Sequence, residues 1–226
     1  MRRSGKNCFI WLFEKLDCWE DESKSTVRKV SNLLCAFIGL FFLGISLFSH
    51  DYIVLFVDKR YIISWRYVPL IVAVYAIKTM YYFYISVIFY DKRATKVLFT
   101  ASISGSIINI ILSSVFIPLW GVNGSILADA IAMVIRVAII YYIYMHKCPD
   151  SGIRLSDFVF NLLVVLIFMF GGLSLSYIKY QESFSIVNFL FKIAVIIIYI
   201  VFQTILYRKE IKRFLLYRKY KGGMKR

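Results

Sequence analysis

Apolar residues along this chain fall in long runs separated by short polar segments. An α-helix needs about 20 such residues to cross a hydrocarbon core about 30 Å thick. The pattern therefore predicts an all-α polytopic membrane protein with six transmembrane helices in one bundle, over 30–49, 67–90, 97–117, 122–144, 158–178 and 186–206. His50 and Asp51 are predicted to end the first span. The flanking segments predict a cytoplasmic amphipathic connector over 1–29 and a cytoplasmic polybasic tail over 207–226.

Two neighbouring spans, joined by the predicted tight turn Pro118–Gly121, each carry one polar stripe. The stripes consist of Ser102, Ser106, Asn109 and Ser113 in the third span, and of Ser125, Asp129, Ala132 and Arg136 in the fourth. At about 100° per residue, residues with this spacing stay within a stripe roughly 60° wide. An ionisable group at bilayer depth is costly and is a functional candidate by default. The stripes therefore predict paired walls of a water-containing path through the membrane.

Composition and charge agree with this architecture. Of the 226 residues, 60% are hydrophobic and 18% are charged, whereas soluble domains average about 45–50% and about 25%. The net charge of +15 would suit nucleic acid, but 21 Lys and Arg residues lie on the side that holds both termini, four on the other side and three inside spans. Because cytoplasmic loops collect Lys and Arg, both termini are predicted to be cytoplasmic. The basic tail then favours anionic membrane lipid over nucleic acid as a partner.

Lys78 lies near the middle of the second span, and Tyr75 and Tyr82 flank it on its own face. An ammonium group binds phosphate as a point charge, and tyrosine rings cover sugar faces. These three residues therefore predict a site for an anionic, sugar-bearing ligand. In the alternative interpretation, Lys78 pairs with a carboxylate such as Asp129 and the tyrosines only pack.

Asp129 and Arg136 are separated by about 10 Å along one helix, which is too far for a direct ion pair. Each is expected to face another helix or water. Arg136 is predicted to contact phosphate, and Asp129 to tune it or carry a proton; alternatively, both join neighbouring helices through a buried network. The serine stripe favours close helix packing, whereas Asn109 must find a partner at this depth.

Lys192 shares a helix face with Asn188, Tyr199 and Gln203. It lies near the outer end of its span and is predicted to extend to the membrane surface. Within the predicted spans, three positive charges face one carboxylate, which favours an anionic cargo or headgroup. The predicted substrate-binding residues are Lys78, Arg136, Asn109, Tyr75, Tyr82, Asp129 and Lys192.

Nothing in the sequence points to an enzyme. The four cysteines form no CxxC pair and no metal-ligand spacing, and there is no nucleophile motif or phosphate-binding loop. His50 and His146 are predicted to lie at opposite membrane faces. The sequence therefore predicts a protein that is not an enzyme, with no catalytic residue, no metal and no cofactor.

The segments Ala94–Lys96, Ser106–Leu112 and Ile117–Ser125 resemble the polysaccharide repeat-unit (O-antigen and capsule) flippases of the multidrug/oligosaccharidyl-lipid/polysaccharide exporter superfamily. In that family an "N-I-I-L-N…I-P-x-x-G-i-x-G-A" hairpin joins two helices late in the chain, and Asn109, Pro118, Gly121 and Gly124 match it. The segment Tyr52–Tyr67 is similar to the family's "llfG-x-x-Y" ending, with Asp58 at the usual glycine position.

The resemblance implies the C-terminal six-helix lobe of a two-lobe exporter. It implies flipping of a polyprenyl-pyrophosphate-linked oligosaccharide from the cytoplasmic to the outer leaflet of the bacterial inner membrane. A single lobe is expected to pair with a separately encoded lobe or with a second copy, or else to be a truncated remnant. Two alternatives are a cation-coupled multidrug exporter lobe and a non-transport membrane scaffold that binds anionic lipid or polysaccharide-assembly partners.

Overall fold

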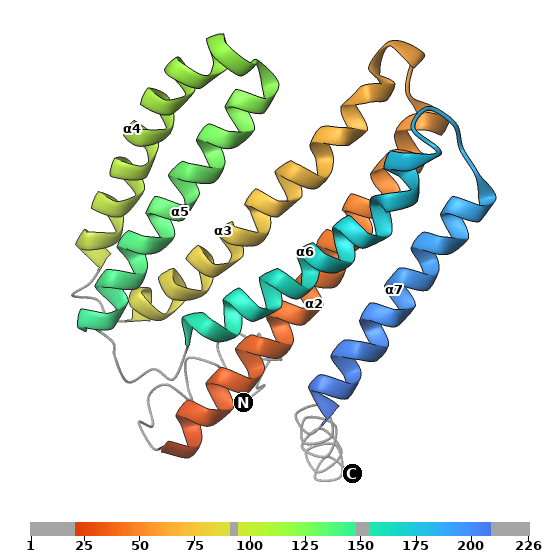
Figure 1. Ribbon diagram of the computed structural model, residues 1–226. Helices are drawn as coiled ribbons and strands as arrows, with labels where there is room; N and C mark the ends of the chain where they lie inside the picture. The colour runs from red at the N-terminus through yellow and green to blue at the C-terminus, as the bar shows by residue number, and fades with distance from the viewer. Residues whose placement is uncertain (1–20, 91–94, 148–153, 209–226) are drawn as a thin grey trace, which may run out of the picture. The chain divides into compact units, whose positions relative to one another are not determined.

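The computed structural model describes residues 21–90, 95–147 and 154–208, and within these ranges it contains helices and no strand. The elements are α2 (Asp21–Phe56), η1 (Lys59–Arg66), α3 (Tyr67–Tyr90), α4 (Thr95–Trp120), α5 (Val122–Lys147), α6 (Leu155–Ile178) and α7 (Ile186–Leu206) (Figure 1). Six of them are long and apolar enough to cross a membrane. The predicted all-α fold class with six spans is confirmed, and the chain is a multi-pass membrane protein.

The first span differs most from its prediction. Helix α2 continues through His50 and Asp51 to Phe56, so the predicted end at this polar pair is wrong. Two polar residues interrupt a hydrophobic run without breaking backbone hydrogen bonds, and both find partners inside the protein. Helices α3 to α7 differ from the predicted spans by less than one turn at either end. Most of the predicted connector and nearly all of the predicted tail lie outside the described residues.

The link from α2 to α3 is the short helix η1, whose start is fixed by Asp58. The Asp58 carboxylate accepts the backbone N–H of Arg60 at 3.0 Å and the Arg60 Nε at 3.3 Å. Both hydrogen bonds hold the pKa of the exposed Asp58 carboxyl below its usual value, and the one from the backbone has the larger effect. Side-chain acceptors of this kind satisfy N–H groups that have no partner in the first turn of a helix.

A one-residue turn joins α4 to α5. Pro118 to Trp120 belong to the last turn of α4, so the predicted four-residue turn reduces to Gly121, whose φ is +56°. Its backbone N–H donates to the Ile117 carbonyl at 2.8 Å. Glycine adopts this left-handed conformation without the penalty that a Cβ imposes. Gly124, one turn into α5, lies so close to the Phe116 carbonyl that a Cβ would overlap it.

The chain divides into two compact units, which are described separately. In the described ranges, unit 1 consists of residues 21–28, 66–90, 95–147 and 154–158, and so contains α3, α4 and α5. Helix α5 packs along both α4 and α3, whereas α3 and α4 touch little (Figure 1). Tyr84 and Tyr144 are buried between α3 and α5 with ring centroids 4.8 Å apart. Arg28 forms a bidentate ion pair with Asp157, in which Nε donates to Oδ2 at 2.5 Å and Nη2 donates to Oδ1 at 2.8 Å.

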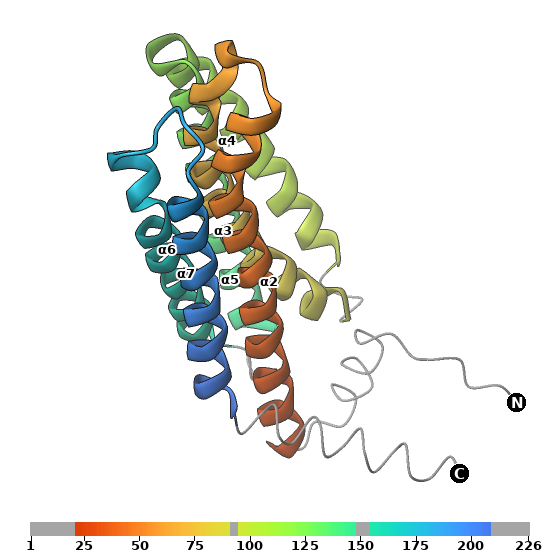
Figure 2. The ribbon, with the colours of Figure 1, turned by 90° about the vertical axis from the view of Figure 1, so that its right-hand side faces the viewer.

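In the described ranges, unit 2 consists of Lys29–Trp65 and of residues 159–208, and so contains α7 and most of α2 and α6 (Figure 2). The Tyr199 hydroxyl of α7 donates to the Ala36 carbonyl of α2 at 3.0 Å, and Tyr207 donates to Asn161 of α6 at 3.0 Å. The middle of the unit is a layer of fully buried apolar side chains: Leu43, Leu47, Met169 and Leu173.

Two glycines of α2 offer a matched test of this packing. A Cβ on Gly39 would lie 2.6 Å from Val165 Cγ2 and 2.7 Å from the Tyr199 hydroxyl, whereas a Cβ on Gly44 would meet nothing within 4 Å. Overpacking costs about 1–3 kcal/mol, so Gly39→Ala should lower the unfolding temperature of the purified protein. Gly44→Ala should leave it unchanged or raise it, because alanine favours helix by about 1 kcal/mol. Equal effects of the two variants would contradict the packing of unit 2.

Candidate functional site

Six of the seven predicted site residues lie in unit 1, and three of these form one group on α3. The Lys78 ammonium lies 5.1 Å from the Tyr75 ring centroid and 5.8 Å from that of Tyr82. Both rings remain about half exposed, at 50% and 54%, and Lys78 is half-buried. Among the described residues, Lys78 forms no ion pair with a carboxylate. The predicted Lys78–Tyr75–Tyr82 grouping is therefore present, and the alternative pairing of Lys78 with Asp129 is not.

Asn109 and Asp129 connect α4 to α5. The Asn109 amide Nδ2 donates to Asp129 Oδ1 at 3.3 Å, and Ser113 donates to Asn109 Oδ1 at 3.2 Å. Asn109 thus has the partner that its depth requires, and the interaction is the helix-joining network offered as the alternative role of Asp129. A carboxylate held by one amide hydrogen bond still has lone pairs to accept further donors or a proton.

Arg136 also reaches from α5 to α4. Its Nη2 donates to the Ser106 hydroxyl at 3.0 Å, and Ser106 donates in turn to the Ser102 carbonyl at 3.0 Å. Gly105 makes room for this side chain, because a Cβ there would overlap its Cγ and Nε atoms. The buried Nε of Arg136 has no hydrogen-bond partner in the described part of the chain. A guanidinium has five N–H donors, so Nη donors beyond the one that Ser106 accepts remain for an anion.

Lys192, the seventh predicted residue, lies in unit 2 and does not extend to the surface. Its side chain is 0% exposed, and Nζ donates to Asp51 Oδ2 of α2 at 2.7 Å. The expectation that it reaches the membrane surface is wrong, because a carboxylate inside the protein replaces water as its partner. The count of one carboxylate within the spans is also wrong, since Asp51 lies inside α2 and gives two.

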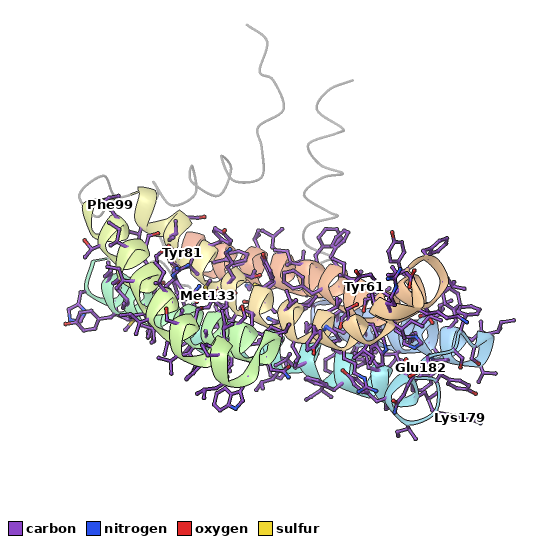
Figure 3. The ribbon with its side chains drawn as sticks, turned by 90° about the horizontal axis from the view of Figure 1, so that it is seen from above. Tyr61, Tyr81, Phe99, Met133, Lys179 and Glu182 are labelled. Atoms are coloured by element: carbon purple, nitrogen blue, oxygen red, sulfur yellow. The ribbon has the colours of Figure 1, made fainter. Side chains whose placement is uncertain are left out.

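When Asp51 is counted among the described carboxylates within the spans, an excess of positive charge remains in unit 1 only. Among the described residues deep in the spans, unit 1 holds Lys78 and Arg136 against Asp129, whereas in unit 2 Lys192 and Asp51 cancel. A cationic surface of low dielectric favours anionic ligands. The predicted site residues that keep this property are therefore those of unit 1, with Lys78 on α3 and Arg136 reaching from α5 to α4. Tyr81 and Met133 lie buried within that unit, and Phe99 is exposed on α4 (Figure 3).

Buried polar side chains gather in unit 2, whereas the excess of positive charge lies in unit 1. In the described ranges, those classed as buried all belong to unit 2: Ser31, Ser46, His50, Asp51, Asn161, Ser176, Asn188, Lys192 and Gln203. Asn188 and Ser176, for example, exchange hydrogen bonds at 3.0 and 3.4 Å. The sequence signal for this set is the α7 face of Asn188, Lys192, Tyr199 and Gln203, but the partners on α2 and α6 are distant in the chain.

Comparisons with protein-family models, with curated proteins and with solved structures found no match.

Labelling of introduced cysteines will show whether the α3 group faces water. In a protein whose native cysteines are replaced by serine, Lys78→Cys and Tyr75→Cys should react with a membrane-impermeant maleimide, because the polar face around them retains water. Ile110→Cys is the control: Ile110 is 67% exposed on α4 but apolar, so lipid should shield it. Labelling confined to position 110, or absent from 75 and 78, would contradict a water-accessible site.

Proposed function

We propose that this chain is one lobe of a membrane exporter that flips a polyprenyl-pyrophosphate-linked oligosaccharide for cell-surface polysaccharide synthesis. The proposal combines the hairpin resemblance with the charge distribution of unit 1. It includes the orientation predicted from Lys and Arg placement, with both termini in the cytoplasm of a bacterial cell. A second lobe, encoded separately or supplied by another copy, completes the transporter.

Lys78 is the observation that carries this proposal. An ammonium group at mid-span normally pairs with a carboxylate, because an isolated charge in hydrocarbon is expensive. Lys78 instead lies between two half-exposed tyrosine rings. This arrangement leaves its N–H donors available to an anion while the rings offer flat surfaces to sugar. A pyrophosphate linked to sugars combines both features in one ligand.

Arg136 would contribute the second cationic contact. It holds Ser106 through one Nη and keeps further N–H groups uncommitted. Guanidinium groups bind phosphate oxygens through paired hydrogen bonds, which add geometric selectivity to charge. Asn109 and Asp129 would then serve mainly to keep α4 aligned with α5, so that Arg136 and the face of α4 move together.

The two alternative functions find less support. A cation-coupled multidrug exporter needs acidic groups that are free for cation binding, whereas Asp51 is ion-paired with Lys192, and among the described residues deep in the spans only Asp129 keeps that capacity. A scaffold acting through the basic tail depends on residues that are mostly outside the described ranges. Deletion of 207–226 separates it from a transporter, because a scaffold should lose all function and a transporter only part.

Ligand binding tests the role of Lys78 in the full-length protein in lipid nanodiscs. The Lys78→Gln variant should bind a polyprenyl-pyrophosphate-linked oligosaccharide about tenfold or more weakly, since a hydrogen bond to a charged group contributes about 1.5–3 kcal/mol. Lys78→Arg, which keeps the charge, should retain most of the affinity. Native mass spectrometry or a thermal shift with increasing ligand measures both.

The control is Lys179→Gln, which removes a lysine that also lies over a tyrosine ring, at 5.5 Å, but in the loop between α6 and α7. It should leave binding unchanged. Equal affinity for the uncharged polyprenol and the pyrophosphate-linked sugar would refute the proposed cargo. So would an unchanged affinity in Lys78→Gln.

A further inference from the structure

A histidine joins the buried ion pair of unit 2. His50 Nδ1 lies 3.3 Å from Lys192 Nζ and 3.4 Å from Asp51 Oδ1, while Nε2 lies 2.6 Å from the Tyr180 carbonyl oxygen. In the described part of unit 2, the charged groups facing this ring are Asp51 of α2 and Lys192 of α7. The helix η1 contributes the Trp65 ring, edge-on at 4.8 Å, and the loop after α6 contributes the carbonyl.

The hydrogen-bond partners fix the proton on one ring nitrogen and leave the other open. A carbonyl oxygen only accepts hydrogen bonds, so Nε2 carries a proton. Nδ1 faces a donor, the Lys192 ammonium, and an acceptor, the Asp51 carboxylate. It can lack a proton and accept from Lys192, or carry one and donate to Asp51. Both states use the same positions of the heavy atoms and differ by one proton.

The surroundings of this cluster differ at its two ends. Toward the loop between α6 and α7, it is covered by Trp65, which donates to the Gln181 carbonyl at 3.1 Å, and by the backbone of Tyr180. Tyr61, Lys179 and Glu182 are exposed at this end (Figure 3). In the other direction lies the apolar layer of Leu43, Leu47, Met169 and Leu173, where Leu47 lies against Gly172. These four side chains cannot form hydrogen bonds, and the buried hydroxyl of Ser46, between Leu43 and Leu47 on α2, has no hydrogen-bond partner among the described residues that would link it to the cluster.

We propose that His50, Asp51 and Lys192 form a proton-binding site that exchanges with water on the side of the α6–α7 loop. A hydronium ion gives one proton to Nδ1 and leaves as water. Nδ1 then gives up its hydrogen bond from Lys192 and donates to Asp51, and the cluster gains one positive charge. Release follows the reverse path. Proton binding at this site does not require the transport activity proposed above.

The histidine count of two makes a direct test possible. His146 contacts the Tyr142 carbonyl and ring on α5, so His146→Gln leaves His50 as the only histidine without touching the cluster. We expect ¹⁵N NMR of this variant, labelled at histidine and purified through a histidine-free tag, to show Nε2 protonated at alkaline pH. Acidification between about pH 9 and pH 4 should protonate Nδ1 as well. An Nδ1 that stays unprotonated throughout, or an Nε2 that lacks its proton, would overturn the site.

Trp65 provides a second readout, because a protonated imidazole quenches an adjacent indole. In a protein with Trp11, Trp19 and Trp120 replaced by phenylalanine, acid should quench Trp65, and His50→Gln should abolish the transition. His146→Gln should leave the transition unchanged, because His146 contacts Tyr142 and not the cluster. A transition that persists in His50→Gln, or one that is lost in His146→Gln, would refute proton binding here.

Sealed proteoliposomes test the direction of exchange. With Lys179→Cys as the sole cysteine in the Trp65-only protein, the fraction labelled from outside gives the fraction of molecules whose α6–α7 loop faces outward. An external acid pulse should quench that same fraction of the emission. Quenching of the complementary fraction would show that protons enter from the opposite side.

Discussion

No water is available inside the hydrocarbon core, so each polar group there must find its partner within the protein. The two units meet this constraint in different ways. Unit 2 buries polar side chains and pairs some of them between helices, as Lys192 with Asp51 and Asn188 with Ser176, while the buried hydroxyls of Ser31 and Ser46 have no partner among the described residues. Unit 1 keeps such groups nearer its surface and leaves Lys78 without a carboxylate among the described residues. The polar groups of unit 2 therefore lie in its interior, and the surface of unit 1 still carries donors that can form hydrogen bonds.

The spans were predictable from sequence because a membrane helix is specified by a local property, the length of an apolar run. The end of α2 was not. His50 and Asp51 look like the end of a hydrophobic segment, and what allows them inside a helix is Lys192, more than a hundred residues later in the chain. Local hydropathy carries no information about such a partner. The one-residue turn at Gly121 was predicted only approximately, because Pro118 is tolerated in the last turn of α4.

The candidate site shows the same division between local and distant information. Residues on one helix, such as Tyr75, Lys78 and Tyr82, could be grouped by helical spacing alone. The need of Asn109 for a partner was also predictable, although its identity, Asp129, required the α4–α5 alignment. The prediction for Lys192 was wrong because its position near the helix end suggested that the side chain extends to the membrane surface. Its ammonium group instead donates to the buried carboxylate of Asp51.

The single-residue connection at Gly121 has a consequence for biosynthesis. Helices α4 and α5 are each 26 residues long. The single residue that links them is too short for one helix to stay outside the bilayer while the other inserts. The two segments must therefore enter the bilayer together as a helical hairpin. The Asn109–Asp129 hydrogen bond then forms within the inserting pair and reduces the cost of bringing an amide and a carboxylate into lipid.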